Sequence, residues 1–211
     1  MKIGLLGGTG KEGRGLAARW ASAGHQIVIG SRDPAKGDNA AAAAAEVVVV
    51  CVPYSGHAAT LRELAPQLDG KIVIDLVVPL APPQITRVFV PDGGAAALEA
   101  QRLLPGARVV GALHHVSSVH LADLAYPITG DVLVCGDDPA AKGIVIGLVG
   151  DLGMRGLDAG PLANAVALEA MTPVLLYLNK RYKRAGLGLR IAGLPDGDPE
   201  RVPEPSPELV R

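Results

Sequence analysis

The chain has 211 residues, of which 49% are hydrophobic and 19% are charged, and its formal net charge is −1 at pH 7. This length predicts one large domain, or one domain with a small annex, around a substantial hydrophobic core. The near-zero charge excludes a strongly basic face for nucleic acid, so we expect none as a partner.

The N-terminus begins a strand and lacks the pattern of a signal peptide. The apolar run from Val47 to Val52 is far too short to span a bilayer. Cys51 and Cys135 lack C-x-x-C spacing and are interpreted as buried thiols of a reducing compartment. We therefore expect a cytoplasmic protein without membrane association.

Short apolar runs alternate with helical segments along the chain, which predicts an α/β fold with a doubly wound, mainly parallel sheet. The expected strands are 2–6, 26–30, 47–52, 71–76, 108–112 and 131–135. The expected helices are 11–23, 39–45, 56–67, 95–103 and 139–152, followed by a long helical pattern from 161 to about 184.

This order predicts a Rossmann-type dinucleotide-binding domain over residues 1–160 and a small helical annex over residues 161–194. Residues 195–211 hold five prolines among polar and acidic residues and predict a disordered tail. The apolar face from Met171 to Leu178 exceeds what a small annex can bury, which predicts a homodimer.

The first strand leads directly into a glycine-rich turn and then into a helix. Gly8, Gly10 and Gly13 form G-x-G-x-x-G in this context. The first glycine permits the tight turn, the second lets the backbone approach a pyrophosphate, and the third lets the helix pack on the strand. The helix start offers unpaired N–H groups to the phosphates. This arrangement predicts dinucleotide binding.

The end of the second strand indicates which dinucleotide is bound. Binders of NAD usually carry an acidic residue there to hold the ribose 2′-hydroxyl, whereas this chain has Ser31 and Arg32, with Lys36 shortly after. A hydroxyl, a guanidinium and an ammonium suit a 2′-phosphate, so NADP is favoured. Two alternatives stay open. Asp33 could instead contact a ribose hydroxyl, or these residues could form an ordinary solvated turn that binds no ligand.

Several sequence blocks, in the same order, resemble the NADPH-dependent F420 reductases, also called F420H2:NADP oxidoreductases. The blocks are 7–10, 24–25, 27–32, 52–54, 112–116, 134–138, 157–162, 178–183 and 188–194. The resemblance implies an oxidoreductase that exchanges a hydride between NADPH and the 8-hydroxy-5-deazaflavin of coenzyme F420. The reactive carbons of that reaction belong to the two cofactors, so no catalytic acid, base or nucleophile is assigned.

The resemblance also implies the site residues. Those expected to bind NADP are Gly8, Thr9, Gly10, Lys11, Glu12, Ser31, Arg32, Lys36, Pro53, Tyr54, His57, Val78 and Ser118. Those expected to bind the deazaflavin are His114, His115 and Leu187. Structural roles for Tyr54 and the two histidines are the alternatives. His114, His115 and His120 lack metal-site spacing, so no metal is expected.

The chain departs from the family pattern after Lys36, where a further helix and strand normally complete the first half of the sheet. We expect the sheet to lose that edge strand and the adenine pocket to lose a wall. Two other functions stay open. One is an NADPH reductase of flavins or ferric chelates on the same scaffold, and the other is a non-catalytic NADP-binding sensor.

Overall fold

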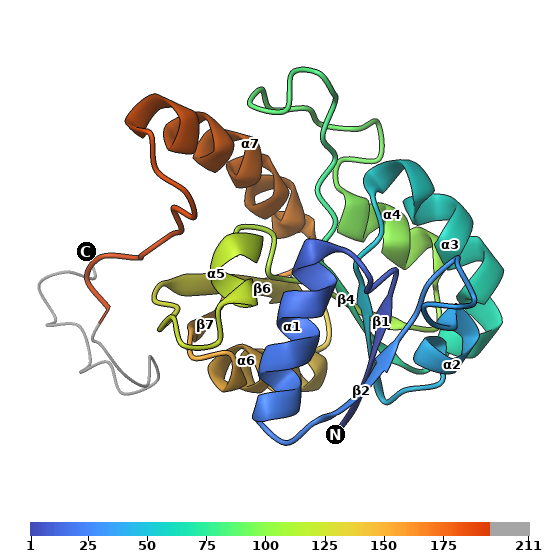
Figure 1. The fold of residues 1–211 in the computed structure, drawn as a ribbon. Coiled ribbons are helices and arrows are strands. Elements are labelled where there is room, and N and C mark those ends of the chain that lie inside the picture. Colours follow the sequence, from blue (N-terminus) through green and yellow to red (C-terminus); the bar gives the residue numbers. More distant parts are fainter. Residues whose placement is uncertain (195–211) are drawn as a thin grey trace, which may run out of the picture.

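The computed structural model describes residues 1–194, which fold around a seven-stranded sheet with helices on both faces (Figure 1). The strands are β1 (Lys2–Leu6), β2 (Gln26–Ile29), β3 (Val47–Val50), β4 (Ile72–Asp75), β5 (Arg108–Gly111), β6 (Asp131–Gly136) and β7 (Arg155–Asp158). The helices are α1 (Lys11–Ser22), α2 (Asn39–Ala43), α3 (Tyr54–Leu68), α4 (Ala96–Leu103), α5 (Ser118–Ala122), α6 (Pro139–Asp151), the 3-10 turn η1 (Leu162–Asn164) and α7 (Ala165–Tyr182).

The strand order is β2-β1-β3-β4-β5-β6-β7, and the first five strands are parallel neighbours. β6 then runs antiparallel to β5, and β7 is parallel to β6. All four valines of β3 are buried, as expected for a central strand that helices cover on both faces. The predicted doubly wound, mainly parallel fold is confirmed.

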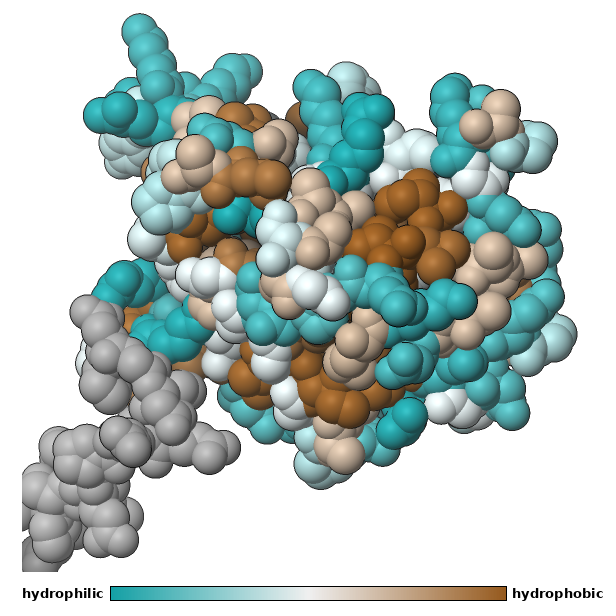
Figure 2. Space-filling view, turned by 60° about the horizontal axis from the view of Figure 1, so that its bottom comes forward, coloured by the Kyte–Doolittle hydropathy of each residue, from teal (hydrophilic) through white to brown (hydrophobic). Residues whose placement is uncertain are grey.

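Two apolar cores lie on opposite faces of the sheet. One contains Trp20 of α1 with Leu121 of α5 and Val145 of α6. The Trp20 indole Nε1 donates to the Leu148 carbonyl at 2.9 Å, which joins α1 to α6. The second core contains Leu61 of α3 with side chains of α4 and α7. Outside these cores, hydrophobic residues form separate patches among hydrophilic ones on the face shown in Figure 2.

The expected strands and long helices are present, with ends that shift by a few residues, but two short elements were not predicted. β7 has the sequence Arg-Gly-Leu-Asp, which lacks the β-branched run that indicates a strand. Pairing with β6 extends it nonetheless. α5 has only five residues, too few to show a helical period.

β2 is an edge of the sheet, because it pairs with β1 alone among the described strands. The chain passes from β2 through a short loop into α2, and the Asp38 side chain caps that helix by accepting the Ala40 N–H at 2.8 Å. A Cβ built on Gly4 would overlap the Ala42 carbonyl, so α2 packs directly on β1. The expected loss of a further edge strand beyond β2 is confirmed.

After α7 the chain returns to the sheet. The Asp131 N–H donates to the Leu189 carbonyl at 2.9 Å, and the Ile191 N–H donates to the Asp131 carboxylate at 2.6 Å. Arg155 donates two hydrogen bonds of 2.7 Å to the same carboxylate and lowers the pKa of Asp131. This return segment, residues 184–191, is called the C-terminal strap below. The boundary at residue 160 stays a prediction, and the predicted tail lies outside the described residues.

Helix α7 also supports α4. The buried Glu169 carboxylate accepts hydrogen bonds from the N–H groups of Ala96 and Ala97, at 2.7 and 3.0 Å, at a helix start that has no side-chain cap of its own.

Among the described residues, one stretch, Leu162–Tyr182, is long and apolar enough to cross a membrane; its mean hydropathy is 1.2, and 33% of the window is buried. Leu162 and Leu168 of that stretch pack in the second core.

Candidate functional site

Two cavities open side by side at the carboxyl ends of the parallel strands, where ligands bind in open α/β sheets. The glycine-loop cavity encloses about 590 Å³ between the β1–α1 turn, the β2 end and α3. The histidine cavity encloses about 620 Å³ between the β4 and β5 ends, α7 and the C-terminal strap. Cys51, Val52 and Pro53, directly after β3, line both cavities. Two ligands bound in these cavities would therefore meet at this segment.

The glycines of the β1–α1 turn differ in what they do. Gly8 is buried and donates its N–H to the Gly30 carbonyl at 3.0 Å. A Cβ on Gly13 would lie 2.6 Å from the Gly8 Cα, so Gly13 permits the close approach of helix and turn. Gly10 is exposed, lines the cavity, and would place a Cβ in open space. The fold does not require glycine at Gly10, whereas a pyrophosphate lying there would.

The cationic rim expected at the β2 end is present. Ser31, Arg32 and Lys36 all line the glycine-loop cavity. Asp33, the residue that could have held a ribose, accepts from Lys36 Nζ at 2.8 Å and from the Ala35 N–H at 3.1 Å, and these bonds lower the pKa of Asp33. Arg32 is exposed and has no hydrogen-bond partner among residues 1–194. The guanidinium is therefore free for a phosphate.

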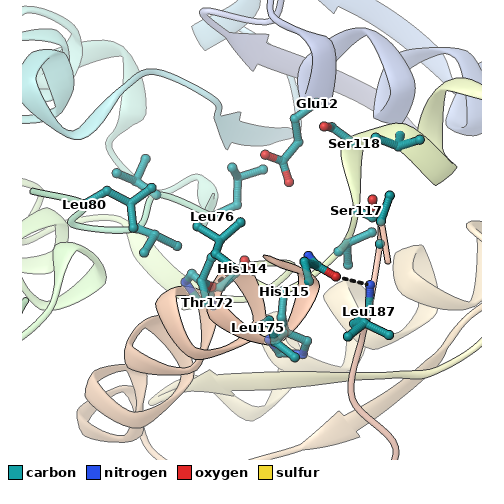
Figure 3. A pocket seen from close by; sticks show the side chains of 18 of the residues that line it. Glu12, Leu76, Leu80, His114, His115, Ser117, Ser118, Thr172, Leu175 and Leu187 are labelled. Carbon is teal, nitrogen blue, oxygen red and sulfur yellow. Dashed lines mark hydrogen bonds between the residues drawn. The ribbon is translucent and has the colours of Figure 1, made fainter. Parts of the chain in front are cut away.

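The histidine cavity brings together residues from six segments of the chain, several of which are seen in Figure 3. His114 and His115 follow β5, Ser118 begins α5, and Leu187 belongs to the C-terminal strap. Helix α7 fixes two of these walls. The Thr172 hydroxyl donates to the His114 carbonyl at 2.7 Å, and the Leu187 N–H donates to the Asn179 side chain at 3.1 Å.

The two imidazole rings are buried without a hydrogen-bond partner on any ring nitrogen. Burial lowers the pKa of His114 to about 4 and also lowers the pKa of His115, so both rings are neutral near pH 7. Each neutral ring keeps one N–H donor and one acceptor nitrogen. Leu113, just before them, has φ +68°, a strained conformation for a leucine of the kind found at binding sites. The four ring nitrogens are themselves buried, so a ligand in the cavity would reach them only if the rings turned.

His57 does not border either cavity, contrary to the sequence expectation. The side chain is fully buried, and its Nε2 lies 2.6 Å from an Asp75 carboxylate oxygen. The other Asp75 oxygen accepts the Val77 N–H at 3.0 Å. Burial lowers the pKa of His57, but the neighbouring acids, Asp75 foremost, raise it above its ordinary value. The pair shapes the β4 loop, in which Val78 lines the histidine cavity.

The other residues expected at the site line different cavities. Pro53 lines both cavities, whereas Tyr54 and Glu12 line only the histidine cavity. The Tyr54 hydroxyl donates to Glu99 at 3.0 Å. Lys11 lies outside both cavities and borders a shallow groove with Arg14, between α1 and α5. Thr9 lines the glycine-loop cavity.

The sequence did not reveal the contribution of α7 to the site. Thr172, Leu175 and Asn179 line the histidine cavity, but their spacing fits an ordinary core helix. Cys51 was expected to be buried and is half-buried, because it lies at the rim that both cavities share. Burial raises the pKa of its thiol well above the ordinary value. Cys135 is buried as expected.

Comparison with known proteins accounts for this geometry. The family described as NADP oxidoreductase, coenzyme F420-dependent, matches residues 2–43 and 35–79. The F420-dependent NADP reductase of Methanocaldococcus jannaschii is 38% identical over 222 aligned positions, which cover 92% of this chain and 99% of that protein. This chain belongs to the family of F420-dependent NADP reductases.

Two further similarities bear on the family assignment. A crystal structure of a candidate F420-dependent NADP reductase from Arthrobacter sp. FB24 has a TM-score of 0.79 and 29% identity, covering 91% of this chain and 99% of that one. The metalloreductase STEAP3 of Rattus norvegicus is 33% identical over 202 residues, but this match covers only 40% of that protein.

The comparisons also bear on the shortened segment after Lys36. The alignment with the M. jannaschii reductase spans 222 positions, more than the 211 residues of this chain, so some residues of that relative have no counterpart here. The two family matches overlap at residues 35–43, which cover the end of the loop after β2 and the whole of α2. This overlap includes part of the short loop that follows the edge strand β2.

Proposed function

We infer that this F420-dependent NADP reductase homologue transfers a hydride reversibly between NADP(H) and the deazaflavin of coenzyme F420. The observation that carries the inference is the junction at Cys51–Pro53, where a cavity with a cationic rim meets a cavity with unsatisfied imidazoles. Hydride transfer needs two rings held in contact and shielded from water, and adjoining cavities meet that need.

For NADP, we propose that the pyrophosphate lies on the β1–α1 turn at Gly10 and the start of α1. The 2′-phosphate is bound by Ser31, Arg32 and Lys36, which line the same cavity. The nicotinamide then extends past Pro53 toward Glu12. The exposed Arg32 guanidinium and the open space at Gly10 support this orientation.

For the deazaflavin, we propose the histidine cavity as the binding site, with Leu187 as a wall of the C-terminal strap. His114 and His115 would form part of the pocket wall, and a turn of either ring would bring a nitrogen that has no hydrogen-bond partner in this structure to a polar edge of the ligand. Arg184, which also lines this cavity, supplies a cation for an anionic group of the coenzyme. The protein thus binds and orients, and contributes no acid or base to the hydride step.

Purified protein mixed with NADPH and F420 tests the proposed reaction. We expect loss of the deazaflavin absorbance at a rate that depends on both ligands, because reduction removes the conjugated chromophore. Turnover of NADPH with free flavin or ferric chelate, and not with F420, would favour the alternative suggested by the metalloreductase similarity. Tight NADPH binding without turnover of any acceptor would favour the sensor.

We also propose that the protein is a cytoplasmic homodimer that buries the outer face of α7. Helix α7 projects from the rest of the fold (Figure 1), and Val174, Tyr177 and Tyr182 are 40%, 54% and 64% exposed. These apolar and aromatic side chains suit a protein interface better than open solvent. Light scattering after size exclusion is expected to give twice the chain mass of 21.6 kDa. A mass equal to one chain would contradict the dimer.

A further inference from the structure

Glu12 lines the histidine cavity near its junction with the glycine-loop cavity, because its charge acts on the Cys51 thiol at that junction. It is the second residue of α1, directly after the glycine turn, and its side chain points into the histidine cavity (Figure 3). Among residues 1–194, its carboxylate has no hydrogen bond or ion pair. The neighbouring Lys11 borders the separate α1–α5 groove and so does not lie in this cavity. Glu12 is therefore a half-buried acid directed at ligand space.

Other ionisable side chains face this cavity from β3, α3, the β5 end and the C-terminal strap. They are Cys51, Tyr54, His114, His115 and Arg184. Burial raises the pKa of the Cys51 thiol and raises the pKa of Tyr54 to about 12, so both stay protonated near pH 7. The two histidines stay neutral because burial lowers their pKa values. Arg184 adds a positive charge to the cavity wall.

Glu12 differs from all of these groups. Burial raises the pKa of Glu12 to about 7. Three other acids lie behind the cavity wall rather than in its lining. Asp75 is paired with His57, Glu99 accepts from the Tyr54 hydroxyl, and Glu169 accepts the N–H groups of Ala96 and Ala97. Among the described residues that line the histidine cavity, Glu12 is thus the one whose charge changes near neutral pH. The charge of the cavity at its junction with the glycine-loop cavity follows this one carboxyl group.

The redox state of a nicotinamide also changes a charge at this junction. The ring carries a positive charge in NADP+ and none in NADPH, whereas the phosphates are the same in both forms. On the proposed function, with the pyrophosphate at the start of α1, the ring lies beside Glu12. A carboxylate in a partly desolvated site therefore interacts differently with the two forms of the nucleotide.

We propose that Glu12 sets the relative affinity of the protein for NADP+ and NADPH, with its ionised carboxylate favouring the oxidised ring. Protonation of Glu12 removes this preference. By linkage, binding of NADP+ favours ionisation of Glu12 and releases its proton to solvent, whereas binding of NADPH does not. Glu12 thereby acts as a specificity residue for the redox state of the nucleotide.

Calorimetric titration of the wild-type protein with each nucleotide between about pH 6 and pH 8 tests this proposal. We expect the ratio of NADP+ affinity to NADPH affinity to rise about fivefold over that range, which corresponds to a shift of about one unit in the pKa of Glu12 on binding of NADP+. Titration of the 2′-phosphate affects both nucleotides and cancels in the ratio. At pH 7, two buffers of different ionisation enthalpy should reveal proton release with NADP+ alone.

The Glu12→Gln variant should bind both nucleotides with a ratio independent of pH and without proton release. Glu46→Gln is the matched control, because Glu46 is an exposed acid at the start of β3 that accepts the Lys2 N–H at 3.3 Å. It should behave as wild type. A wild-type ratio that does not change with pH, or a change that persists in Glu12→Gln, would overturn the role of Glu12 and leave the proposed function standing. Failure of the wild type to bind either nucleotide would overturn both.

Discussion

The Arg32→Glu variant is expected to bind NADPH about 100-fold more weakly than the wild-type protein, while its NADH affinity changes by less than about threefold. Arg32 lines the glycine-loop cavity with a free, exposed guanidinium. Lys36 is partly engaged by Asp33 at 2.8 Å, so Arg32 is the more available cation for the 2′-phosphate. Charge reversal removes that bond and adds repulsion, whereas NADH has no phosphate there.

Fluorescence titration with both reduced nucleotides measures the two affinities directly. Arg62→Glu is the matched control, because Arg62 is exposed on α3, lies outside the lining of both cavities, and gives the same change in net charge. Equal losses for NADPH and NADH in Arg32→Glu would mean that Arg32 does not contact the 2′-phosphate. A loss in Arg62→Glu of similar size would attribute the effect to overall charge.

Alanine at Gly10 and at Gly13, the last two glycines of the β1–α1 motif, should separate folding from binding. In Gly13→Ala the new Cβ would lie 2.6 Å from the Gly8 Cα and 2.7 Å from its carbonyl oxygen, which are backbone atoms that cannot turn aside. We expect the free energy of unfolding to fall by roughly 1–3 kcal/mol or more. The better helix propensity of alanine, about 1 kcal/mol, offsets only part of this loss.

Gly10→Ala provides the comparison, because a Cβ there meets no protein atom within 4 Å and the φ of −70° suits alanine. Its unfolding free energy should change by less than about 1 kcal/mol, the usual scale of a helix-cap effect. Its NADPH affinity should fall, because the methyl group occupies the space proposed for the pyrophosphate. Thermal and denaturant unfolding with NADPH titration test both variants. A stable Gly13→Ala, or a Gly10→Ala with normal affinity, would contradict this division of roles.

Local patterns predicted most of the sheet and the cationic rim of the site. The valine runs of β3 and the glycine turn carry their information within a few residues, as does the Ser31–Arg32 pair. β7 and the direction of β6 depend instead on pairing between distant strands. These non-local contacts leave no period in the sequence.

The incorrect placement of His57 has a simple geometric cause. Tyr54 and His57 are three residues apart on α3 and so share a face, with their ring centroids 6.3 Å apart. Tyr54 lies at the cavity, and His57 lies one turn deeper, against Asp75. The position after a strand indicates that a residue is near the site, but the depth of each helical turn is set by tertiary packing. For the same reason, the sequence did not indicate that Thr172 and Asn179 on α7 line the histidine cavity.

The edge position of β2 affects how the nucleotide is held. With no described strand beyond β2, the far end of the glycine-loop cavity is bordered by the turn that carries Ser31 and Lys36 and, across the cavity, by α3. An adenine ring there has less apolar wall to cover it, so a larger share of the affinity rests on exposed cations and phosphates. Interactions between exposed charges weaken as salt is added, and at 0.1 M salt they decay over a Debye length of about 10 Å. We therefore expect rising ionic strength to weaken the binding of NADP and to reduce the preference for NADP over NAD.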